Sequence, residues 1–317
     1  MTRPVQLGLI GAGRWGRNYI PTVAALDSAT LVSVTSSNPQ IARQIPPECT
    51  VVADWREVAA NTGVDGVIIA TPPATHREMC DYALSHGTPV LVEKPTTLSL
   101  ADTQALSDRA RSRGVPLLVN HVHLFSSAYV ELKMLGPQLG TVTRIASFAG
   151  NFGPYREDCP VLWDWGPHDV AMCIDLLGTG ASTIACSRIA GQPVENGYAE
   201  RLLIELAFDT GATAAIHLST MDPKRRQFAV YGTRGTAVYD DLAPYKLCLF
   251  PPGTVVLDST DPSTGTPVEI DATPPLARAV EAFVRAIDAG RFDPAPVDLA
   301  VEVARILERC ATEIESA

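Results

Sequence analysis

The chain has 317 residues, a formal net charge of −10 and a hydrophobic content of 46%, a composition typical of folded globular proteins. At roughly 100–200 residues per domain, this length predicts two domains. Lys and Arg total 25 against 35 Asp and Glu. This balance argues against a general nucleic-acid or anionic-membrane binder, because either would require a basic face.

The cysteines indicate a reducing compartment. All seven are scattered, with no CxxC pair, which is typical of free thiols and not of a disulfide framework or a zinc site. No apolar run near the N-terminus is long enough for a secretory signal or a membrane span. We therefore expect a cytoplasmic protein without a metal site, and without nucleic-acid or membrane partners.

The first 120 residues alternate between strand and helix patterns. Short apolar runs such as Val5–Ile10, Gly66–Ala70 and Val90–Val92 are separated by helical patterns such as Arg77–Ser85 and Leu100–Arg113. Strands that alternate with helices predict βαβ units around a parallel sheet that is buried on both faces.

The pattern changes after about residue 120. Helical stretches within 128–135 and 162–177 are followed by strand-like runs, including Arg201–Phe208 and Ala212–Thr220, with turn residues between them. Such turns suit hairpins and therefore a mostly antiparallel sheet. We expect an α/β Rossmann domain at residues 1–120 and an α+β domain with an open, mostly antiparallel sheet at residues 121–317.

The segment Gly11-Ala12-Gly13-Arg14-Trp15-Gly16 fits the pattern G-x-G-x-x-G. In such a loop the first glycine allows a tight turn, the second lets a pyrophosphate approach the backbone, and the third lets helix and strand pack closely. The motif alone is weak because glycine-rich turns are common. Here it follows the first strand and opens the first helix, so it predicts dinucleotide binding.

The end of the second strand bears on the choice of dinucleotide. An acid that binds the ribose 2′-hydroxyl of NAD is expected about 20 residues after the loop, but residues 35–40 contain none. Ser36 and Ser37 offer hydrogen bonds to a 2′-phosphate, and Arg14 or Arg43 offers charge. This favours NADP over NAD. The alternative is a solvated turn with two surface arginines.

Two further groups of residues suggest proton transfer. Glu93-Lys94-Pro95 lies at the end of the strand-like run Val90–Val92. The partly desolvated amine of Lys94 can bind a substrate oxygen there and exchange its proton. Asp164 and His168 are four residues apart, so they share one face if Asp164 begins a helix, and a carboxylate fixes and activates an imidazole. The alternatives are a charged strand end and an ordinary helix N-terminal pair.

Four motifs, in this order, resemble the Gfo/Idh/MocA family of NAD(P)-dependent sugar and cyclitol oxidoreductases. They are Gly11–Gly16, Ala70-Thr71-Pro72-Pro73-Ala74-Thr75-His76, Glu93-Lys94-Pro95 and Trp163-Asp164-Trp165-Gly166-Pro167-His168-Asp169. The resemblance covers essentially the whole chain and is closest to members that act on nucleotide-activated sugars at C3. Ala171 stands where many members carry an aspartate, which bears on substrate contacts more than on the chemistry.

The resemblance implies roles for individual residues. Lys94 is the expected proton-transfer group, often followed by a cis proline bond, while Asp164 and His168 contact sugar hydroxyls and His168 takes part in proton transfer. The expected cofactor-binding residues are Gly11, Gly13, Arg14, Trp15, Gly16, Ser36, Ser37, Arg43, Thr71, Pro72, His76, Glu93, Lys94 and Pro95, although His76 also fits a helix-packing role. The expected substrate-binding residues are Lys94, His121, His123, Tyr155, Arg156, Asp164 and His168.

The implied activity is hydride transfer between NADP or NAD and a hydroxyl or ketone of a sugar, nucleotide sugar or cyclitol. The implied assembly is a homodimer or homotetramer that uses the open sheet. Two alternatives are an NAD-dependent glycoside hydrolase of the same fold and a non-enzymatic dinucleotide-sensing regulator. The regulator is disfavoured because the lysine and histidine of the motifs are both present.

Overall fold

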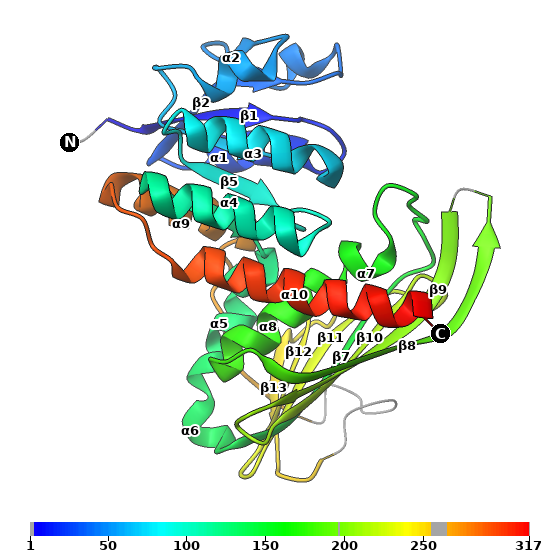
Figure 1. Ribbon diagram of the computed structural model, residues 1–317. Helices are drawn as coiled ribbons and strands as arrows, with labels where there is room; N and C mark the ends of the chain where they lie inside the picture. Colours follow the sequence, from blue (N-terminus) through cyan, green and yellow to red (C-terminus); the bar gives the residue numbers. More distant parts are fainter. Residues whose placement is uncertain (1–2, 196, 255–264, 317) are drawn as a thin grey trace. The chain divides into compact units, whose positions relative to one another are not determined.

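The computed structural model describes residues 3–195, 197–254 and 265–316, and the chain divides into two compact units. The first unit consists of Met1–Val122 and Pro274–Ala304, and the second of His123–Thr273 and Arg305–Ala317. Each unit has its own sheet and its own helices (Figure 1).

The first unit contains a parallel sheet. Its described strands follow the order β3-β2-β1-β4-β5-β6, and every pair in it is parallel. The predicted Rossmann-type sheet is thus confirmed, and its strand order reverses between β1 and β4, where such sheets bind ligands. The strands are β1 Val5–Ile10, β2 Ala29–Thr35, β3 Thr50–Val51, β4 Gly66–Ile69, β5 Val90–Glu93 and β6 Leu117–Asn120.

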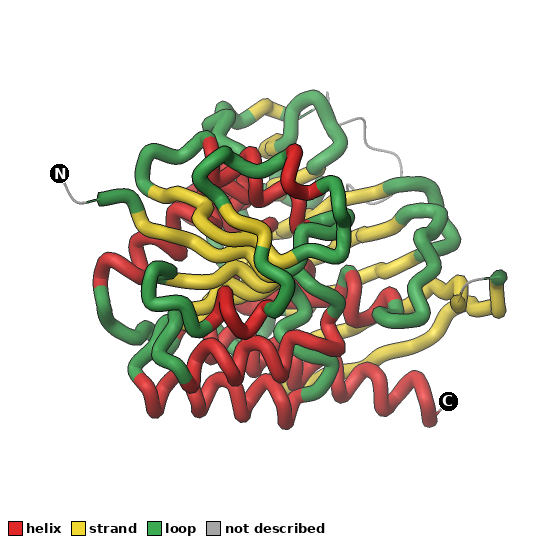
Figure 2. Tube along the Cα trace, turned by 90° about the horizontal axis from the view of Figure 1, so that it is seen from above, coloured by secondary structure: helices red, strands yellow, loops and turns green. Residues whose placement is uncertain are grey.

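Helices bury both faces of this sheet, which explains why its strands are continuous apolar runs. Alternate side chains of β4, such as Val67 and Ile69, belong to a core with α2, α3 and α4, whereas Ile68 belongs to the opposite core with α1 and α9. The alternation of strand, loop and helix can be followed in Figure 2. The helices are α1 Tyr19–Ala24, α2 Trp55–Ala59, α3 His76–Ser85, α4 Leu100–Arg113, α9 Pro275–Ala289 and the start of α10, Ala295–Ser316.

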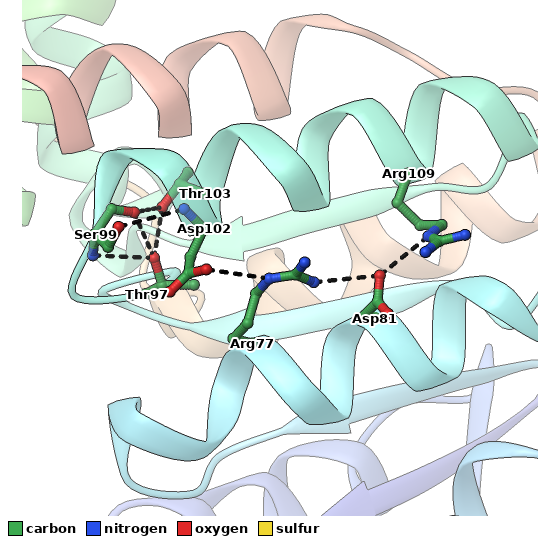
Figure 3. Close-up of polar contacts among 7 residues, drawn as sticks. All are labelled: Arg77, Asp81, Thr97, Ser99, Asp102, Thr103 and Arg109. Carbon is green, nitrogen blue, oxygen red and sulfur yellow. Dashed lines mark hydrogen bonds and ion pairs between the residues drawn. The ribbon is translucent and has the colours of Figure 1, made fainter.

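A hydroxyl network fixes the start of α4, just after the segment that contains Lys94 (Figure 3). Ser99 caps the helix by accepting a hydrogen bond from the Asp102 backbone N–H at 3.3 Å. The Thr97 hydroxyl donates to the Ser99 carbonyl at 2.7 Å and lies 2.8 Å from the Thr103 hydroxyl. These bonds satisfy polar groups at the helix end and hold the preceding turn in one conformation.

Ion pairs join α3 to α4 next to this network (Figure 3). Arg77 pairs with Asp81 at 3.2 Å and with Asp102 at 3.3 Å, and Arg109 pairs with Asp81 at 3.0 Å. Because these side chains are a third to a half exposed, each pair contributes little stability. The Arg77–Asp81 pair lies within α3, and the other two pairs connect the two helices.

The second unit contains a mostly antiparallel sheet, as predicted. Its described strands follow the order β14-β13-β12-β11-β7-β10-β9-β8, and β10 and β7 form a parallel pair. Between β7 and β10 the chain passes through α7, α8 and the β8–β9 hairpin, and β10 then runs beside β7 in the same direction. The strands are β7 Val142–Gly150, β8 Ala181–Val194, β9 Gly197–Phe208, β10 Thr213–Ser219, β11 Arg225–Gly232, β12 Thr236–Asp240, β13 Leu247–Phe250 and β14 Thr266–Pro267.

Helices cover one face of this sheet (Figure 1). Inward-facing residues such as Leu202, Ile204 and Ile216 are buried, whereas Leu203 and His217 on the other face are only half-buried. The helices are α5 Ser127–Met134, α6 Gly136–Leu139, α7 Val161–Asp164, α8 Gly166–Leu177 and the end of α10. Sheets with one covered face show this alternation.

Candidate functional site

The glycine loop follows β1 in the first unit, and its three glycines have different surroundings. Gly11 has a φ of +93°, and a Cβ there would lie 2.6 Å from the Thr71 Cγ2 atom. A Cβ at Gly16 would lie 1.9 Å from the Gly11 carbonyl oxygen, whereas a Cβ at Gly13 would meet nothing within 4 Å. Gly11 and Gly16 are therefore required for packing, and Gly13 leaves an open face of backbone. This arrangement fits the approach of a pyrophosphate.

Glu93 at the end of β5 anchors the loop. Its Oε1 atom accepts hydrogen bonds from Trp15 Nε1 at 2.6 Å, the Tyr19 hydroxyl at 2.6 Å and Asn120 Nδ2 at 2.8 Å. Burial and the Glu93 carboxylate raise the pKa of Tyr19 well above its usual value. Trp15 keeps 47% of its surface exposed, so its indole is held at one edge while the rest remains accessible.

His76 bridges the turns that follow β4 and β5. Its ring is fully buried, with Nδ1 2.9 Å from the Pro95 carbonyl oxygen and Nε2 2.9 Å from the Thr71 carbonyl oxygen. Burial lowers the pKa of His76. The Thr71 hydroxyl accepts a hydrogen bond from Thr75 at 2.7 Å, and Pro72 precedes the short turn Pro73–Thr75. His76 thus connects the turn after β4 with the turn after β5, next to the Lys94–Pro95 bond, which is cis.

Lys94 and His121 extend the same edge of the sheet. Because Glu93 pairs with Asn120 in the parallel register of β5 and β6, the next residue of each strand lies at the carboxyl edge, where open α/β sheets bind ligands. Lys94 is half-buried. His121 is 3% exposed, and its pKa is lowered to about 4 by burial and by the charge of Lys94. Its imidazole is therefore neutral at pH 7.

The end of β2 carries no carboxylate. Ser36 accepts a hydrogen bond from the Asn38 backbone N–H at 3.1 Å, which closes the turn. Ser37, Arg14 and Arg43 are exposed. The nearest acid after this strand is Glu48, so none of the residues at the strand end would repel a 2′-phosphate.

In the second unit, Asp164 and His168 lie on separate helices. Asp164 ends α7, and α8 begins at Gly166 with Pro167 in its first turn, so the expected single helix is interrupted. Arg156 donates to Asp164 at 3.3 Å and to Asp158 at 3.0 and 2.8 Å. These carboxylates, Asp158 first, raise the pKa of Arg156. Arg156 thereby holds the carboxylate of Asp164, which is 15% exposed.

His168 packs against His123. The two ring centroids are 4.7 Å apart at 86°, and His123 Nδ1 lies 3.2 Å from the Tyr239 hydroxyl. Tyr155 is half-buried in the loop that also carries Arg156. The second unit therefore brings together an Arg156–Asp164 pair and a His123–His168 pair. The first unit contains the other predicted site residues.

The buried contact between Asp169 of α8 and Ser147 of β7 was not predicted. Asp169 is 5% exposed and accepts a short hydrogen bond from the Ser147 hydroxyl, and burial raises its pKa to about 6. The Arg226 guanidinium lies 4.4 Å from the Trp165 ring centroid, and burial lowers its pKa while Asp169 and Asp164 favour its charged form. These residues come from α8, β7 and β11, so no local sequence pattern connects them.

No helix in the part of the chain that the structure describes is long and apolar enough to cross a membrane. Among the same residues, no three or more His, Cys, Asp or Glu side chains are grouped so that they could hold a metal ion.

Comparison with known families matches both halves of the chain. Residues 5–121 match the model of the oxidoreductase family with an NAD-binding Rossmann fold, and residues 138–238 match the GFO/IDH/MocA C-terminal domain. The crystal structure of a protein from Magnetospirillum magnetotacticum MS-1 is 42% identical, covers 97% of this chain and 99% of that chain, and superposes with a TM-score of 0.91.

Relatives of known activity are more distant. The scyllo-inositol 2-dehydrogenase (NAD(+)) of Bacillus subtilis is 28% identical over 252 residues, 74% of each chain. The UDP-N-acetylglucosamine 3-dehydrogenase of Acidithiobacillus ferrooxidans is 27% identical over 292 residues, 90% of each chain. Structures of other relatives contain NAD or NADP+. The chain therefore belongs to the Gfo/Idh/MocA family and is an NAD(P)-dependent oxidoreductase.

Proposed function

We propose that this protein transfers a hydride between NADP, in preference to NAD, and a hydroxyl or ketone of a sugar, cyclitol or nucleotide sugar. The open backbone at Gly13, between the closely packed Gly11 and Gly16, carries the proposal. The substrate class is supported by the names of the relatives. We assign cofactor binding to residues 1–120, and substrate binding and oligomerisation to residues 121–317.

The nicotinamide, when bound, supplies or accepts the hydride. Lys94 manages the proton in this proposal, because a half-buried ammonium at the sheet edge can donate a hydrogen bond to the reacting oxygen and then give up its proton. Gly11, Gly13 and Gly16 admit the pyrophosphate, with Arg14 and Trp15 beside it. The turns at Thr71–Pro72 and Pro95 flank the nicotinamide end, and His76 and Glu93 hold these segments in place.

In the second unit, Asp164 and His168 bind hydroxyls of the substrate. Arg156 orients the Asp164 carboxylate through a hydrogen bond, and His123 packs edge-on against His168. An orienting neighbour matters because proton transfer requires the imidazole in one defined position. Tyr155 and Arg156 lie on the same loop, where the guanidinium can also bind a substrate phosphate or carboxylate.

The open face of the second sheet is the proposed oligomer interface. Phe148 and His217 stack there with ring centroids 4.5 Å apart, and Ile189 keeps 54% of its surface exposed. We infer a homodimer or homotetramer, and light scattering at micromolar concentration tests this, since a monomer mass would contradict it. We also propose a cytoplasmic location, supported by seven buried cysteines, none of which forms a disulfide.

The test is absorbance at 340 nm with NADP(H) and NAD(H) against UDP-N-acetylglucosamine, scyllo-inositol and D-xylose. The proposal predicts turnover of at least one such substrate, and loss of most of it in Lys94→Ala. Two results would overturn it. One is a Lys94→Ala variant that turns over like wild type, and the other is substrate conversion without net change in NAD(P)H, which indicates a hydrolase.

A further inference from the structure

His121 is buried without a hydrogen bond in the part of the chain that the structure describes. Its side chain is 3% exposed, and neither Nδ1 nor Nε2 has a partner. Protein interiors satisfy nearly all buried polar groups, because leaving one unpaired costs about 1–3 kcal/mol. A histidine kept in such a position requires an explanation.

The position of His121 in the sheet indicates which part of a ligand its ring would contact. It follows β6 directly, beside Lys94 at the end of β5. In a doubly wound sheet the dinucleotide crosses the point where strand order reverses, here between β1 and β4. The glycine loop after β1 receives the pyrophosphate, so the ends of β4, β5 and β6 receive the nicotinamide half.

We propose that His121 is a cofactor-binding residue, one of whose ring nitrogens accepts a hydrogen bond from the carboxamide NH2 group of the nicotinamide ring. The assignment rests on the proposed dinucleotide function of this unit. A neutral imidazole has one N–H donor and one nitrogen acceptor. The NH2 group of a carboxamide donates to such an acceptor, and the two ring nitrogens point too far apart for one carboxamide to bind both.

Burial, followed by the charge of Lys94, keeps His121 in the required form. Both disfavour protonation of the ring and lower its pKa, so it stays neutral at physiological pH. An imidazolium would have two donors and no acceptor, and it would fail to match the NH2 group of the carboxamide. His121 keeps its proton throughout and is a binding group, whereas Lys94 exchanges a proton.

The test compares two probes that differ only in the nicotinamide. His121→Phe removes both ring nitrogens and keeps a planar ring. We expect this variant to bind NADPH about tenfold more weakly, the loss of one net hydrogen bond, and to bind 2′-phospho-ADP-ribose, which lacks the nicotinamide, as tightly as wild type. His121→Asn retains one donor and one acceptor and should bind NADPH within about threefold of wild type.

Thermal unfolding of the ligand-free protein provides a second measurement. Removing an unpaired buried polar group should leave the melting temperature of His121→Phe equal to or above that of wild type. His86→Phe is the matched control, because His86 is exposed and bonds to the Tyr82 carbonyl at the end of α3. That control should change neither dissociation constant.

Three outcomes would overturn the assignment. If His121→Phe binds both probes more weakly to the same extent, or binds both as tightly as wild type, His121 does not bind the nicotinamide. A lower melting temperature of ligand-free His121→Phe would show that the ring already has a structural partner. Wild-type protein that binds neither probe would refute the dinucleotide function itself, and the assignment with it.

Discussion

Replacement of Gly13 by alanine separates binding from folding at the glycine loop. Gly13 is exposed, its φ does not lie in the left-handed region, and an added Cβ meets nothing within 4 Å. The folded chain therefore accommodates the methyl group. Because alanine restricts the unfolded chain, Gly13→Ala should stabilise the protein by about 0.4–1 kcal/mol, which corresponds to a rise in melting temperature of about 1–4 °C.

The same methyl group occupies the face of the backbone that a pyrophosphate must approach. Losing one charge-assisted hydrogen bond to a backbone N–H costs about 1.5–3 kcal/mol, so the dissociation constant for NADPH should rise about 10–100-fold. Gly16→Ala should behave differently, because its Cβ would lie 1.9 Å from the Gly11 carbonyl oxygen. A backbone atom there cannot move aside, and the expected result is a loss of about 1–3 kcal/mol of stability.

The assay is fluorescence titration with NADPH, combined with thermal unfolding of each ligand-free variant. Stable Gly13→Ala protein that binds NADPH with the wild-type dissociation constant would refute the reasoning. Gly16→Ala protein as stable as wild type would refute the packing argument alone.

Three further changes probe the remaining residues. Lys94→Ala should lower turnover about a hundredfold, because general acid–base catalysis contributes in this range, while the NADPH dissociation constant stays within about threefold of wild type. Steady-state kinetics measure the turnover, and an NADPH titration of the same variant measures the dissociation constant. The pKa of Asp169 is raised from 3.8 to about 6, so the stability that this carboxyl contributes is complete below pH 3.8 and is lost as the pH rises through 6, by about 3 kcal/mol. Urea unfolding at pH 4 and pH 7 should therefore show a smaller decrease in the free energy of unfolding for Asp169→Asn than for wild type. Equal decreases in the two proteins would contradict this prediction. Arg43→Ala should weaken NADPH binding about tenfold and leave NADH binding unchanged; titration that shows equal weakening of both would remove Arg43 from the 2′-phosphate site.

The parallel sheet of the first unit was predictable because its signals are local. Runs such as Val90–Val92 are buried on both faces, so each is continuously apolar. Gly114 ends α4 with a left-handed φ of +66°, a conformation that glycine adopts readily at the end of a helix. The break between Asp164 and His168 was harder to see, although Pro167 marks it, because proline also fits the first turn of a helix.

The contacts that hold the site were not predictable because they join distant segments. Trp15 and Asn120 meet on the Glu93 carboxylate from positions 78 and 27 residues away. His76 was expected to bind cofactor or pack its helix, and the 2.9 Å contacts of its two ring nitrogens with main-chain carbonyl oxygens depend on two turns folding against it. The unpaired ring of His121 likewise depends on burial, which a single sequence does not show.

The most direct test of the dinucleotide site is a fluorescence titration of the purified protein, stripped of endogenous cofactor, with NADPH and separately with NADH. The open backbone at Gly13 and the absence of acid at the end of β2 predict saturable binding of both, with NADPH bound more tightly. Tighter binding of NADH would contradict the 2′-phosphate site formed by Ser36, Ser37 and Arg43. Saturable binding of neither nucleotide would contradict the proposed dinucleotide site.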